Sequence, residues 1–296
     1  MLHETPVVFD SQGVPLSGRI LRNTASLTER QPAVIVIGSW LTVKEQMATT
    51  YGRRLAESGC TAFVFDFTGF GESEGEPRQA ELPARKIADI RAAAEFLRTL
   101  AFVDADRIGA VAICASAQYT LAALAQGAPI RSWASVAGWF HDPASVAPFY
   151  GGAPGVTRRV ERAREALERY AATRETLIAP AYEPGNERAG MHFDLDYYAQ
   201  PSRGAIPAWP NAMAEMTWLY WLAFDGLAPA GAVATPSLFV HADGCVFPDH
   251  VRQVHARVTG PKSLVWATGN QIDFYDQPAQ VDAAMAAIGG WFTQTL

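Results

Sequence analysis

Residues 108–119 read Ile108-Gly-Ala-Val-Ala-Ile-Cys-Ala-Ser-Ala-Gln-Tyr119, an apolar run that passes directly into a helical pattern. The run predicts a strand buried on both faces of a sheet, and the following residues, to Ala125, predict a helix. Cys114 stands at the join, and its neighbours are small. A sharp turn between a strand and a helix needs small neighbours because the two backbones approach closely there. The pattern therefore favours a nucleophile at Cys114, with its thiolate stabilised by the N-terminus of the helix. The alternative is a small buried core cysteine.

The pattern extends outward from this stretch as an alternation of strands and helices. An N-terminal hairpin with strands at 6–9 and 16–21 is expected first. Buried strands are then expected at 33–37, 61–67, 107–113, 132–137, 236–241 and 263–266, and helices at 44–58, 82–100, 118–125 and 280–292. This alternation predicts the α/β class, with a doubly wound, mostly parallel sheet.

The alternation stops between residues 141 and 232, where charged and aromatic helical patterns at 158–178 and 211–227 replace it. A helical insertion between two late strands is interpreted as a lid over the sheet. The predicted organisation is therefore a core of residues 1–140 and 233–296, with a lid of residues 141–232 inserted after the sixth strand.

A second candidate for the nucleophile is Ser73, in the Gly-x-Ser-x-Gly string Gly71–Gly75. No helix follows this string, since Pro77 comes two residues later and a helical pattern starts only near Leu82. Glutamates beside Ser73 would also destabilise a developing negative charge. The string is therefore interpreted as a structural loop.

Composition excludes several classes of partner. The net charge of −6 provides no basic surface for nucleic acid. No apolar run approaches the ~20 residues that a membrane helix needs, and the N-terminus lacks the pattern of a signal peptide. Three widely spaced cysteines suit free thiols in a reducing cytoplasm. The expected partner is a small-molecule substrate, with no nucleic acid and no membrane, and a homodimer is compatible with the sequence.

Several segments together resemble the α/β-hydrolases, and in particular a cysteine-elbow subgroup similar to dienelactone hydrolases and to bacterial peptidase-like or polyketide-transferase-like enzymes. They are the elbow itself, Val36-Ile-Gly-Ser-Trp40, Asp66-Phe-Thr-Gly-Phe-Gly-Glu-Ser73, Phe239-Val-His241 with Pro248, and Asp273-Phe-Tyr-Asp276. The resemblance implies an oxyanion hole made by the backbone N–H groups of Trp40 and Ala115. It also implies that the loop around Ser73 is structural.

The sequence departs from this family where a catalytic histidine and an acid are expected. Gln271 occupies the position of the histidine, and Gly244 and Cys245 occupy that of the acid. A thiol tolerates the loss of a base better than a serine does, because its pKa is far lower. We expect His141, at the tip of the strand beside the elbow, to act as the base, with Asp243 or a residue of the lid to orient it. The alternative is that His141 only packs under the lid.

Aromatic residues gather at the predicted strand ends and in the lid, which favours an apolar or aromatic ligand. The expected substrate-binding residues are Trp40, Trp139, Trp218 and Gln271. The histidines do not have metal-ligand spacing, so no metal is expected. The glycine-rich Gly69–Gly75 has no helix to hold a pyrophosphate, so no cofactor is expected either.

Two functions follow from these residues. The first is a hydrolase or acyl transferase whose Cys114 attacks the carbonyl of a small, largely apolar ester, lactone or thioester. The alternative is a protein of the same fold that binds a small hydrophobic ligand without hydrolysing it, which Gln271 and the empty acid position would suit.

Overall fold

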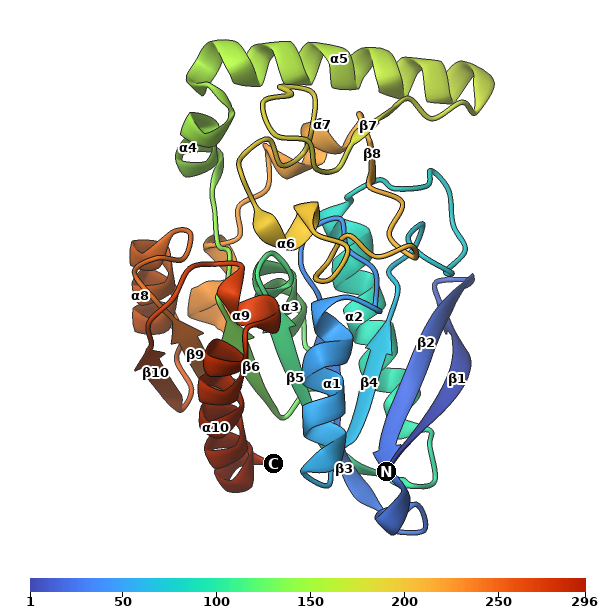
Figure 1. Cartoon of the computed structure of the whole chain (residues 1–296), viewed down its shortest axis with the longest axis vertical. Coiled ribbons are helices and arrows are strands. Elements are labelled where there is room, and N and C mark those ends of the chain that lie inside the picture. The colour runs from blue at the N-terminus through green and yellow to red at the C-terminus, as the bar shows by residue number, and fades with distance from the viewer.

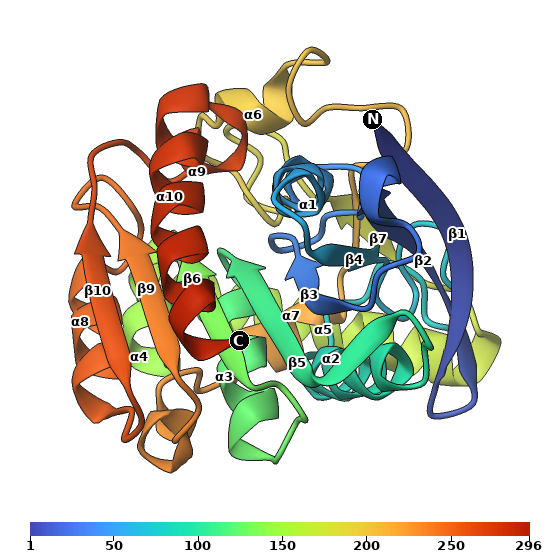
Figure 2. The ribbon, with the colours of Figure 1, turned by 90° about the horizontal axis from the view of Figure 1, so that it is seen from below.

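A single eight-stranded sheet runs through the protein, which is described by a computed structural model of residues 1–296 (Figures 1 and 2). The strand order is β1-β2-β4-β3-β5-β6-β9-β10. The strands are β1 (Leu2–Ser11), β2 (Val14–Asn23), β3 (Gln31–Ile37), β4 (Thr61–Phe65), β5 (Val103–Ile113), β6 (Ser132–Val136), β9 (Ser237–His241) and β10 (Lys262–Trp266). The first two form an antiparallel hairpin that joins β4 antiparallel, and the other six strands of this sheet are parallel to one another. The predicted fold class is confirmed.

Helices cover both faces of this sheet (Figure 2). One face carries α1 (Met47–Glu57) and α10 (Pro278–Thr295), and the other carries α2 (Pro83–Arg98), α3 (Ser116–Ala125) and α8 (Pro248–Arg257). The segments 33–37 of β3, 62–65 of β4 and 108–113 of β5 are apolar and buried, as parallel strands between two helical layers must be. Their carboxyl ends therefore open toward one edge of the sheet, where the intervening loops gather.

The segment between β6 and β9 lies over that edge, with its long helix farthest from the sheet (Figure 1). We call residues 141–232 the insertion. It contains α4 (Pro143–Val146), α5 (Gly152–Thr173), β7 (Ile178–Pro180), α6 (Asp196–Ala199), β8 (Ala212–Ala214) and α7 (Thr217–Trp221).

The helix expected at 158–178 corresponds to α5, but the helix expected at 211–227 is wrong. Residues 212–214 instead form β8, which pairs antiparallel with β7. The side chain of Asn211 accepts from the Tyr182 N–H and donates to the Tyr182 carbonyl, so it holds this segment extended. Only the five residues of α7 remain helical, because tertiary hydrogen bonds outweigh the local propensity.

The loop after β4 is structural, as the sequence indicates. The Ser73 hydroxyl donates to the Asp66 carbonyl at 2.6 Å and accepts from the Ser17 N–H at 2.9 Å. Its side chain is buried and fully used, so Ser73 is not a nucleophile. Beside it, the carboxylate of Asp66 forms a buried ion pair with the Lys44 ammonium at 2.6 Å.

Candidate active site

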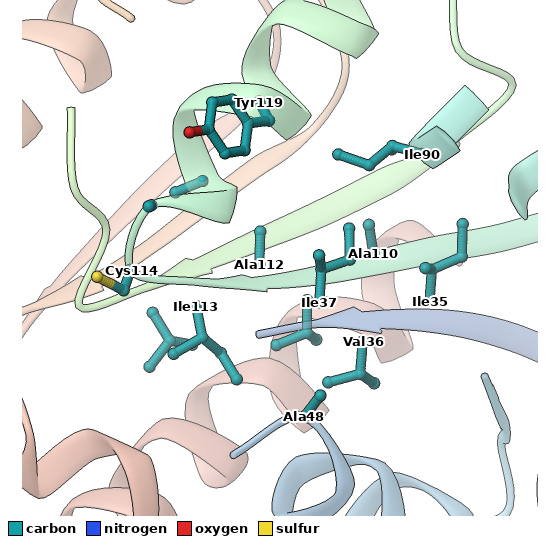
Figure 3. Close-up of a cluster of buried hydrophobic side chains, with 14 of the residues drawn as sticks. Ile35, Val36, Ile37, Ala48, Ile90, Ala110, Ala112, Ile113, Cys114 and Tyr119 are labelled. Atoms are coloured by element: carbon teal, nitrogen blue, oxygen red, sulfur yellow. The ribbon is translucent and has the colours of Figure 1, made fainter. Parts of the chain in front are cut away.

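The turn between β5 and α3 places Cys114 in a strained backbone conformation. Its φ is 57°, in the left-handed region that residues with a side chain rarely adopt. The Cys114 N–H donates to the Val136 carbonyl, and the Cys114 carbonyl accepts from Ala117 and Trp139. Figure 3 shows the thiol at the end of the strand, where the ribbon turns into the helix. Such strain costs about 1–3 kcal/mol and is typical of functional sites, where the surrounding structure enforces it.

Three alanines, Ala112, Ala115 and Ala117, surround this turn and are fully buried. The Ser116 hydroxyl donates to the Gly38 carbonyl, which ties the start of α3 to the loop after β3. The start of α3, the end of β5 and the loop after β3 meet at this turn and leave no room for larger side chains. This close approach is why the turn needs small residues.

A mostly apolar cavity lies over the thiol, between the carboxyl ends of the strands and the insertion. Its volume is about 100 Å³, somewhat less than the ~150 Å³ that holds a benzene ring in a protein core. Core loops and the insertion both contribute to its lining, which consists of Ser39, Trp40, Cys114, Ala115, Trp139, Phe149, Tyr150, Gly190, Met191, Phe193, Leu195, Tyr198, Trp221, Val246, Gln271, Ile272 and Tyr275.

The polar groups beside the sulfur are hydrogen-bond donors. Burial raises the pKa of the Cys114 thiol above its usual value. The hydroxyls of Ser39 and Tyr275, the Ala115 N–H and the Gln271 amide oppose this effect, because they favour the thiolate. Burial is the larger influence, so the resting group is the neutral thiol.

Gln271 is held rigidly in the position where the resemblance places a histidine. Its Nε2 donates to the Ala137 carbonyl at 2.7 Å and to the Tyr275 hydroxyl at 3.3 Å. Its Oε1 accepts from the Val246 N–H at 3.1 Å. The side chain is therefore a fixed amide that can neither take up nor release a proton near neutral pH.

The backbone N–H groups of Trp40 and Ala115 donate to no backbone carbonyl, and the Ala115 N–H lies beside the Cys114 sulfur. Both residues are buried and line the cavity beside Cys114. An oxyanion hole needs two donors that can bind a developing negative charge. The expectation that Trp40 and Ala115 supply them stays a prediction.

His141 does not occupy the position expected of a base. Its ring is fully buried within the insertion and is not part of the cavity lining. Nδ1 accepts from the Trp139 indole at 2.6 Å, and Nε2 donates to the Trp221 carbonyl at 2.9 Å. Burial lowers its pKa to about 4. Both ring nitrogens of His141 are occupied by these hydrogen bonds, so its geometry fits a packing role under the insertion. The expectation that His141 acts as the catalytic base is therefore corrected.

Asp243 also lies outside the cavity. Its side chain is 78% exposed and pairs with Arg252 at 3.0 Å. At the neighbouring acid position, a side chain on Gly244 would lie 2.5 Å from the Gly269 carbonyl, so no carboxylate fits there. Cys245 is buried, and burial raises its pKa to about 12. Residues 243–245 therefore place no carboxylate beside Cys114. The expectation that Asp243 orients the catalytic base is wrong.

Among the expected substrate-binding residues, Trp40, Trp139 and Gln271 line the cavity. Trp218 does not: it packs behind the wall against Trp40 and Tyr150, with ring centroids 5.9 and 4.8 Å away. Sequence reasoning missed Ser39 and Tyr275 as neighbours of the thiol. Tyr275 had an available signal, since it follows Gln271 by four residues, a spacing that brings side chains together in a helical turn.

No three histidine, cysteine or acidic side chains come together in an arrangement that could hold a metal ion. None of the helices has the length and apolar character needed to cross a bilayer.

The fold and the elbow define the class of protein. The alpha/beta hydrolase GrgF from Penicillium sp. sh18 superposes with a TM-score of 0.83 at 20% identity, covering 99% of each chain. The hypothetical protein PA2218 from Pseudomonas aeruginosa superposes with a TM-score of 0.86 at 24% identity, covering 100% of this chain and 94% of the other. The protein has the α/β-hydrolase fold that the resemblance implies.

Sequence comparison finds a relative that matches most of the chain and enzymes that match parts of it. No family model matches the chain. The uncharacterized protein YcjY from Escherichia coli is 28% identical over 285 residues, which cover 91% of this chain and 90% of the relative. The thiohydrolase aneE from Aspergillus aculeatus is 30% identical over 52% of this chain and 46% of its own length. The polyketide transferase claH from Penicillium crustosum is 31% identical over 38% of this chain and 37% of its own.

The reactivity of Cys114 should depend steeply on pH. Because only the thiolate is nucleophilic and the pKa of the thiol is raised, its alkylation by iodoacetamide should accelerate about tenfold per pH unit between pH 7 and 9. The rate is measured by peptide mass mapping, which separates Cys114 from Cys60 and Cys245. A His141→Gln variant should give the same pH dependence. A plateau that begins near pH 6–7 would contradict this, since it would reveal an imidazole partner.

Proposed function

We propose that the protein is an enzyme of acyl transfer in which Cys114 attacks the carbonyl of a small, largely apolar ester, lactone or thioester. The single observation that carries this proposal is the strained, left-handed backbone of Cys114 at the strand-to-helix turn. A core cysteine needs no such strain, whereas a nucleophile gains exposure to the cavity from it.

The chemistry begins when Sγ forms a bond to the carbonyl carbon, and the thiol proton passes to the leaving group that later departs. The carbonyl oxygen then becomes an oxyanion, which the N–H groups of Trp40 and Ala115 would bind. Donors of this kind contribute about 3 kcal/mol each in the transition state. Collapse of the intermediate expels the leaving group and yields a thioester on Cys114.

The similarity to a thiohydrolase and to a polyketide transferase supports carbonyl chemistry of this kind. The aromatic cavity supports an apolar acyl group, because its walls offer few hydrogen-bonding partners.

The test is direct acylation. The protein is incubated with phenyl thioacetate and with p-nitrophenyl acetate, and the acyl adduct is located by mass spectrometry. We expect an acetyl group on Cys114, and Cys114→Ala should lose both adduct and turnover while Cys60 and Cys245 remain available as internal controls. Labelling of Cys60 at the same rate as Cys114 would overturn the proposal.

Gln271 favours a second candidate, namely ligand binding without turnover. Its three hydrogen bonds give the site a fixed amide in place of a base. In that case a small aromatic compound would bind and raise the melting temperature, while the activated acyl donors would leave Cys114 unmodified.

A further inference from the structure

We infer that this site exchanges acyl groups between thiols: it takes the acyl group from a thioester and passes it to a neutral thiol instead of to water. The inference rests on the proposed function of Cys114. It limits the acyl donor to a thioester and the acyl acceptor to a thiol.

No group that lines the cavity can act as a base near neutral pH. Its titratable members are Cys114, Tyr150, Tyr198 and Tyr275, and burial raises the pKa of each. Gln271 cannot accept a proton at all.

None of the six histidines is part of the cavity lining, and the two fully buried ones do not supply the missing base. His141 has both ring nitrogens bonded, Nδ1 to the Trp139 indole and Nε2 to the Trp221 carbonyl. His241 donates from Nε2 to the Val246 carbonyl at 3.2 Å and is not part of the lining. Burial lowers the pKa of both to about 4. Neither ring is placed to remove a proton from a molecule in the cavity.

Water needs a base to attack a thioester, because its own pKa is about 15.7. General-base assistance typically contributes 10²–10⁴-fold to such a step. A thiol has a pKa near 8.5 in water, about seven units below that of water, so in the same cavity it loses its proton during an attack far more readily than water does. The site therefore slows hydrolysis of the acyl-enzyme far more than it slows attack by a thiol.

The same environment disfavours amines and alcohols. An alkylamine is a cation near neutral pH, and no carboxylate lines the cavity to pair with it. An alcohol has the same need for a base as water. A thiol is neutral and largely apolar, so it can enter an aromatic cavity at little cost.

Both steps balance without an added reagent. In the first, Cys114 forms an S–C bond to the acyl carbon, the C–S bond of the donor breaks, and the thiol proton of Cys114 ends on the departing thiol. In the second, the acceptor thiol forms the new C–S bond, the bond to Cys114 breaks, and the acceptor's proton returns to Cys114. An oxygen ester would instead release an alkoxide, which needs an acid that the cavity does not provide.

The experiment separates the two steps. The full-length protein is acylated with phenyl thioacetate, freed of reagent, and divided among buffer alone and buffer with equal concentrations of N-acetylcysteamine, ethylamine or ethanol. Loss of the Cys114 adduct is followed by intact mass, and the new thioester is identified in solution. The urea-unfolded acyl-protein gives the uncatalysed exchange rate for each acceptor.

We expect the thiol to release the acyl group about 100-fold or more faster than buffer alone, faster than from the unfolded protein, and as a new thioester. Ethylamine and ethanol should add little. In Gln271→His, release in buffer alone should accelerate, because the variant supplies a base. Release by water as fast as by the thiol, or exchange no faster than in the unfolded protein, would overturn the inference while leaving Cys114 as the nucleophile. If no adduct forms on Cys114, the proposed function itself fails.

Discussion

Replacing Gln271 with histidine is expected to raise hydrolysis of an activated ester by about 10²-fold or more. The amide of Gln271 lies beside the Cys114 thiol and lowers its pKa slightly, so an imidazole in its place reaches the same atoms. A positioned base contributes 10²–10⁴-fold in comparable reactions. The gain should fall at the lower end, because Gly244 leaves no room for a carboxylate to orient the new ring. The measurement is the steady-state rate of p-nitrophenyl acetate hydrolysis between pH 5 and 9.

Gln271→Leu is the matched control, since it removes the same hydrogen bonds to Ala137, Val246 and Tyr275 without adding a base. The histidine variant should also gain a rate limb near pH 6–7, where imidazole titrates. Addition of Cys114→Ala should abolish the gain. Equal rates for the histidine and leucine variants would show that a base at this position is of no use to Cys114.

Replacing Lys44 with methionine is expected to lower the free energy of unfolding by about 3–5 kcal/mol. The ammonium of Lys44 is fully buried and lies 2.6 Å from Asp66 and 2.7 Å from Glu72. Removing it leaves the carboxylate of Asp66 buried without its counter-charge, which is the costly way to break an ion pair. The measurement is equilibrium unfolding in urea, with and without the substitution.

Arg98→Ala is the control for this second prediction. Arg98 pairs with Glu95 at 3.1 Å on the surface, with both side chains about half exposed. Solvent screens such a pair, so its loss should cost no more than about 1 kcal/mol. Comparable losses for the two variants would mean that the interaction of Lys44 with Asp66 is as weak as a surface pair.

The residues around Cys114 explain why the elbow could be predicted from sequence. A strand buried on both faces must be apolar along its whole length, and a tight turn into a helix must have small neighbours. Both requirements act between residues close in the chain, so the sequence displays them directly. The structural role of Ser73 was predictable for the same reason, since no helix follows it to complete a turn.

The partners of His141 and Asp243 could not be predicted in this way. His141 was placed at the tip of β6, but its two nitrogens bond to Trp139 and to the carbonyl of Trp221, 80 residues away in the insertion. Asp243 follows β9 as expected, yet its side chain faces solvent and Arg252. The partner of His141 is set by how the insertion packs on the sheet, and that of Asp243 by how α8 packs beside β9.

Local apolar pattern and residue identity were enough to predict the strands of the main sheet, the position of the cysteine turn and the absence of a histidine at Gln271, but not the strands β7 and β8 of the insertion. Only the tertiary structure decided that Ser39, Tyr275 and Gln271 surround the sulfur with donors and that no base reaches it. These residues come from loops after β3 and β10 that the sheet brings together. Hydrogen bonds between segments far apart in the chain fix them there, and no local pattern encodes such bonds.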